Sequence, residues 1–84
     1  MPLTADQTGI ALAIDAAMAK LTKASKTDAE ILGAMADHMP GFKALLDAGV
    51  VNQAADRYPG FRRFAEILEL FAKAIRDGAI KVPK

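Results

Sequence analysis

Hydrophobic side chains recur every three or four residues along most of this chain, which is the spacing of one face of an α-helix. The clearest case is residues 60–77, where the apolar positions are Phe61, Phe64, Ile67, Leu68, Phe71 and Ile75. Charged residues fill the opposite side of that segment. The pattern predicts a long amphipathic helix with these apolar side chains in the core.

A second long helix is predicted near the start of the chain. Thr4 and Gln7 form a capping box, in which each side chain bonds the backbone N–H of the other residue, so we expect the helix to begin at Thr4 and to run to about Leu21. Its predicted core face consists of Ile10, Ile14, Ala17, Met18 and Leu21.

Three shorter helices are predicted between the two long ones. The first begins at a capping box of Thr27 and Glu30 and ends at Pro40, because proline cannot continue a helix interior. The second runs from Pro40 to a stop at Gly49, and the third covers residues 50 to about 57. Pro59 then begins the last helix.

These elements predict an all-α fold: a compact small bundle of about five helices, two long and three short. The 84 residues are enough for one domain, residues 1–84, in which we expect 79–84 to be an extended tail. A domain of this size buries a modest fraction of its surface, and association with a second copy is a common remedy.

An internal repeat relates residues 28–45 to residues 47–64, and each copy contains a Pro-Gly-Phe elbow. Two explanations are open: a pair of equivalent ligand sites, or repeated packing of Phe42 and Phe61. We favour packing and expect both elbows to have the same backbone shape. The elbows are similar to the hydrophobic-Pro-Gly-hydrophobic turn of helix-hairpin-helix DNA-binding motifs, but Lys43 and Arg62 stand where that family has a second glycine.

The composition gives little support to an enzyme. There is no cysteine and one histidine, His38, and we find neither metal-ligand spacing nor a glycine-rich phosphate loop. We therefore expect a non-enzymatic protein without cofactor or metal; an enzymatic role remains only as a subunit completing another chain's site. Residues 1–6 lack the basic stretch and long apolar region of a signal peptide, and no apolar run is long enough to span a bilayer, so we expect a cytoplasmic protein without a membrane partner.

One functional hypothesis is nucleic-acid binding. The net charge is only +1, but Lys43, Arg57, Arg62 and Arg63 gather around the elbows. Arginines at a helix N-terminus can bind a phosphate. The simpler explanation is a solvated helix face with charge pairs such as Arg62–Glu66.

The other hypothesis is protein interaction. The back of the first helix is a strip of mostly small residues: Gly9, Leu12, Ala13, Ala16 and Ala19. Such a strip permits close helix approach, either because the first helix is buried all round in its own fold or because a second copy packs there. Leu70 also stands on the polar side of the last helix. We favour a small non-enzymatic interaction or regulatory module, a homodimer or a partner of another protein, with a nucleic-acid-binding module as the alternative.

Overall fold

The computed structural model describes residues 3–78, and within them the chain forms five α-helices and no strand. The all-α prediction is therefore confirmed. The elements are α1 (Ala5–Lys23), α2 (Asp28–Ala34), the 3-10 helix η1 (Ala36–His38), α3 (Met39–Asp47), α4 (Val51–Arg57) and α5 (Pro59–Arg76). The predicted tail, residues 79–84, lies outside the described residues.

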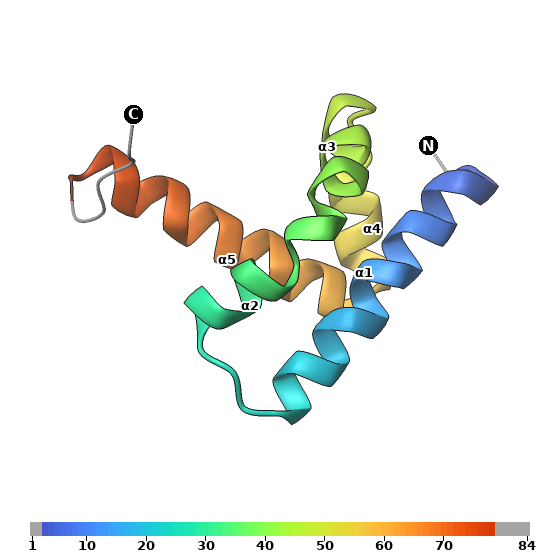
Figure 1. Cartoon of the computed structure of the whole chain (residues 1–84). Helices are drawn as coiled ribbons and strands as arrows, with labels where there is room; N and C mark the ends of the chain where they lie inside the picture. The colour runs from blue at the N-terminus through green and yellow to red at the C-terminus, as the bar shows by residue number, and fades with distance from the viewer. Residues whose placement is uncertain (1–2, 79–84) are drawn as a thin grey trace.

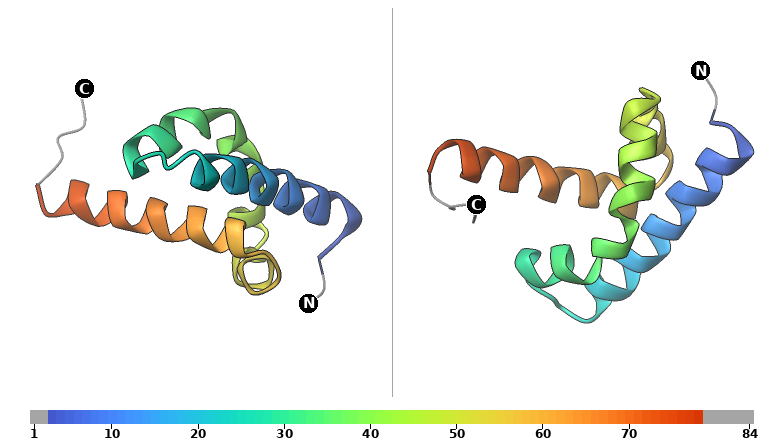
Figure 2. Two further views of the ribbon diagram at one scale, coloured as in Figure 1. Left: turned by 90° about the horizontal axis from the view of Figure 1, so that it is seen from below. Right: turned by 45° about the horizontal axis from the view of Figure 1, so that its top comes forward.

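The two long helices, α1 and α5, cross and form the main contact of the fold (Figure 1). α4 packs on the first half of α5, and α3 lies against α1. The second half of α5 extends away from α1, α3 and α4 (Figures 1 and 2). The core therefore sits where α1 meets the first half of α5.

Both predicted capping boxes are present. The Gln7 N–H donates to the Thr4 hydroxyl at 3.1 Å, and the Thr4 N–H donates to Gln7 Oε1 at 2.9 Å. Thr27 and Glu30 make the same pair of bonds at 2.9 and 3.2 Å. These local bonds satisfy N–H groups that the helix ladder leaves free, so α1 and α2 begin where the sequence predicts.

The helix predicted to end at Pro40 ends earlier, at Ala34. Proline has no N–H for the Ala36 carbonyl, and its ring crowds the preceding turn. The chain makes a 3-10 turn instead, in which the His38 N–H donates to the Met35 carbonyl at 2.9 Å. The break leaves Met35 fully buried and sets Pro40 in the first turn of α3.

The core contains most of the predicted residues. Fully buried side chains include Ile14 and Met18 of α1 together with Phe61, Phe64 and Ile67 of α5. Other members are Ala11, Ile31, Met35, Phe42, Leu45, Val50 and Ala54. The prediction for Ile75 is wrong: this side chain is 42 % exposed, because it lies on the part of α5 that extends beyond the other helices.

The two Pro-Gly-Phe elbows differ in shape, contrary to expectation. Met39 is helical, with φ −62° and ψ −42°, whereas the matching Tyr58 is extended, with φ −125° and ψ 107°. Their phenylalanines nevertheless meet: the rings of Phe42 and Phe61 stack with centroids 5.5 Å apart. Phe42 also meets Phe64 edge-on at 5.5 Å. The repeated phenylalanines therefore pack against each other in the core.

Each elbow glycine allows a close approach to α1. A Cβ on Gly41 would lie 2.9 Å from Ile10 Cγ2. A Cβ on Gly60 would lie 2.6 Å from Asp15 Oδ1 and 2.7 Å from the Asp15 carbonyl oxygen. Any larger residue at Gly60 would therefore push α5 away from the backbone of α1.

Candidate interaction surfaces

The strip predicted on the back of α1 lies on the solvent side of the helix. Its five members are all exposed: Gly9, Leu12, Ala13, Ala16 and Ala19. We call this set the outer face of α1. Leu12 is 47 % exposed, and a Cβ added at Gly9 would meet nothing within 4 Å. The explanation that α1 is buried all round is therefore wrong for this chain alone.

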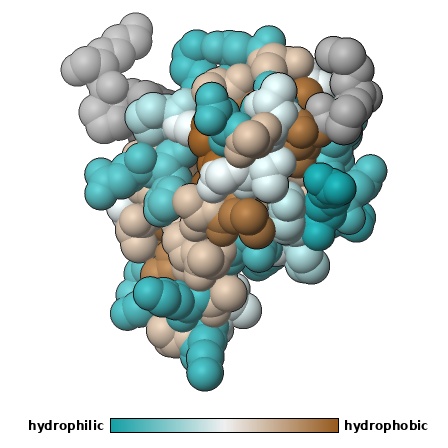
Figure 3. Space-filling model, turned by 90° about the vertical axis from the view of Figure 1, so that its right-hand side faces the viewer, coloured by the Kyte–Doolittle hydropathy of each residue, from teal (hydrophilic) through white to brown (hydrophobic). Residues whose placement is uncertain are grey.

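The outer face has a reason to be exposed within this fold. Ala11, Ile14 and Met18 lie on the opposite side of α1 and are fully buried against the other helices. The fold thus uses one side of the helix and leaves the other to solvent. Seen from the side of the molecule on which α1 lies, weakly hydrophobic atoms form a band with hydrophilic atoms at its edges (Figure 3).

Leu70 belongs to a separate surface. It is 55 % exposed on α5, ten residues beyond Gly60, where that helix meets α1. Ten residues of helix span about 15 Å, so Leu70 is not continuous with this contact. Exposed neighbours on the same helix are Glu66, Glu69, Lys73 and Ile75. A single exposed leucine among charged side chains is common on protein surfaces.

Three of the four predicted phosphate-binding cations are paired with carboxylates. Lys43 lies 2.7 Å from Asp47, and Arg62 lies 3.3 Å from Glu66; both pairs are exposed and one helical turn apart. Arg57 is exposed at the end of α4. Exposed pairs of this kind contribute little to stability, but each carboxylate offsets the positive charge that would attract a phosphate.

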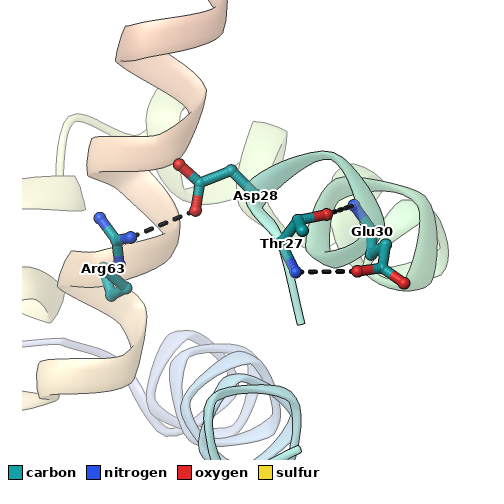
Figure 4. A network of polar contacts seen from close by, with 4 residues as sticks. All are labelled: Thr27, Asp28, Glu30 and Arg63. Carbon is teal, nitrogen blue, oxygen red and sulfur yellow. Dashed lines mark hydrogen bonds and ion pairs between the residues drawn. The ribbon is translucent and has the colours of Figure 1, made fainter. Parts of the chain in front are cut away.

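Arg63 makes the longest-range of these ion pairs. Its Nη2 lies 3.2 Å from Asp28 Oδ1, so α5 is joined to the first turn of α2 (Figure 4). Asp28 follows Thr27 of the capping box, so the start of α2 is held by a local cap and by a contact from another helix. The side chains of this pair are 48 % and 42 % exposed.

The N-terminus of α5 already has an anionic partner. The Gly60 N–H donates to the Asp15 carboxylate at 2.6 Å. The side chain of Tyr58, the residue before the helix, makes no capping hydrogen bond. Asp15 comes from α1 and is half-buried. A phosphate approaching these N–H groups would meet the Asp15 charge. Nucleic-acid binding by this end of α5 remains a prediction that this geometry does not favour.

Sequence reasoning missed the role of Asp15. A signal was present: Asp15 is an acidic residue in an alanine-rich helix, and the residues four positions away, Ala11 and Ala19, carry no charge to pair with it. Its partner lies 45 residues away. Only the crossing of α1 and α5 brings the two together.

His38 is half-buried at the end of η1. Within residues 3–78, no three His, Cys, Asp or Glu side chains are placed to hold a metal ion together. Over the same residues, no helix has the length and apolar character needed to cross a membrane.

Comparison of the chain with models of protein families, with curated proteins and with solved structures finds no match. Any function proposed for it therefore rests on its own surfaces.

Proposed function

We propose that this chain is a small non-enzymatic interaction module that associates with a second copy of itself through the outer face of α1. The observation that supports the proposal is the exposure of an uncharged apolar strip over about three turns of the longest helix. Small side chains let two helix backbones approach closely, which increases van der Waals contact. Leu12 supplies a larger side chain on that face.

The size of the chain adds support. The described core has only 12 buried hydrophobic residues, and two of them are alanines. Small domains with modest cores are often stabilised by association. Covering Leu12 and its alanine neighbours would remove further apolar surface from water at about 25 cal/mol per Å². We also propose a cytoplasmic location, for which the absence of cysteine is the motive.

The test is sedimentation equilibrium over a concentration series, comparing the native chain with the double variant Ala13→Glu/Ala16→Glu. Both alanines are exposed, so the variant should stay folded by circular dichroism and should be monomeric. The matched control is Ala36→Glu/Ala44→Glu, which adds the same charge at exposed alanines of η1 and α3. This control should associate like the native chain.

A native chain that remains monomeric up to roughly millimolar concentration would contradict the proposal. If both double variants associate as strongly as the native chain, the interface does not include the outer face of α1. An unfolded Ala13→Glu/Ala16→Glu variant would show that this side of α1 is part of the core, contrary to its exposure.

A further inference from the structure

We draw no further inference here: the strongest candidate, the apolar face on the second half of α5, which continues the core side of that helix past the other helices through the half-buried Phe71 to the 42 % exposed Ile75, is an unpartnered surface, and nothing in the structure shows what covers it.

Discussion

Replacing Asp15 by alanine should destabilise the fold through the start of α5. The Asp15 carboxylate accepts the Gly60 N–H at 2.6 Å, and α5 has no side-chain cap from its own neighbours. A hydrogen bond to a charged group contributes about 1.5–3 kcal/mol. Alanine returns about 0.5 kcal/mol through its higher helix propensity. We therefore expect a net loss of about 1–2.5 kcal/mol in the free energy of unfolding.

The assay is urea unfolding followed by circular dichroism, with linear extrapolation to zero denaturant. The matched control is Asp56→Ala, which removes an exposed carboxylate from the last turn of α4 and makes the same change of residue type within a helix. This control should change stability by no more than about 0.5 kcal/mol. Asp15→Asn keeps an acceptor oxygen without the charge and should fall between Asp15→Ala and the native chain.

In thermal unfolding, the loss for Asp15→Ala corresponds to a fall of roughly 4–20 °C in Tm. Equal stability of Asp15→Ala and Asp56→Ala would refute the reasoning. It would show that water hydrogen-bonds the Gly60 N–H as favourably as the Asp15 carboxylate does. The stabilisation from the contact between α1 and α5 would then come from its apolar side chains.

Two further predictions follow from local structure. Gly33→Ala should stabilise the chain by about 0.5–1 kcal/mol in the same urea assay, since Gly33 is inside α2 and a Cβ there meets nothing within 4 Å. The Thr27 backbone N–H, followed by the Thr27 hydroxyl, lowers the pKa of Glu30 below its ordinary value. The ionised Glu30 carboxylate therefore stabilises the fold at pH values above its ordinary pKa of about 4.3. This stabilisation is lost as the pH falls through the lowered pKa. Relative to Glu30→Gln, the native chain should lose stability between about pH 5 and pH 2; a constant difference would contradict this.

The helices were predictable because their determinants are local. Threonine caps, proline at the start of α5 and the spacing of Phe61 and Phe64 each act within one or two turns. The early end of α2 at Ala34 was not predicted, because Pro40 prevents the helix from continuing through it but does not specify where the preceding residues change to a 3-10 turn. The exposure of Ile75 likewise depends on where α5 extends beyond the other helices, and the sequence of α5 alone does not reveal that position.

The surfaces were predictable only in part. The outer face of α1 was recognised from its composition, but whether it is buried was open until the positions of the other helices were known. The cations at Arg62 and Arg63 were recognised, but only Glu66 among their partners lies within reach along the sequence. Asp28, which pairs with Arg63, lies 35 residues away, and Asp15 accepts a hydrogen bond from the Gly60 N–H 45 residues away, so sequence spacing alone does not reveal either contact.

The bond between Asp15 and Gly60 also bears on the order in which the chain folds. It joins residues 45 positions apart, so α2, α3 and α4 lie within the loop that it closes. Closing such a loop costs chain entropy before any contact across it is made. The starts of α1 and α2 carry their own capping boxes and need no such closure. We therefore expect the meeting of α1 and α5 to limit the rate of folding, and the first turn of α5 to become fixed only when that meeting has occurred.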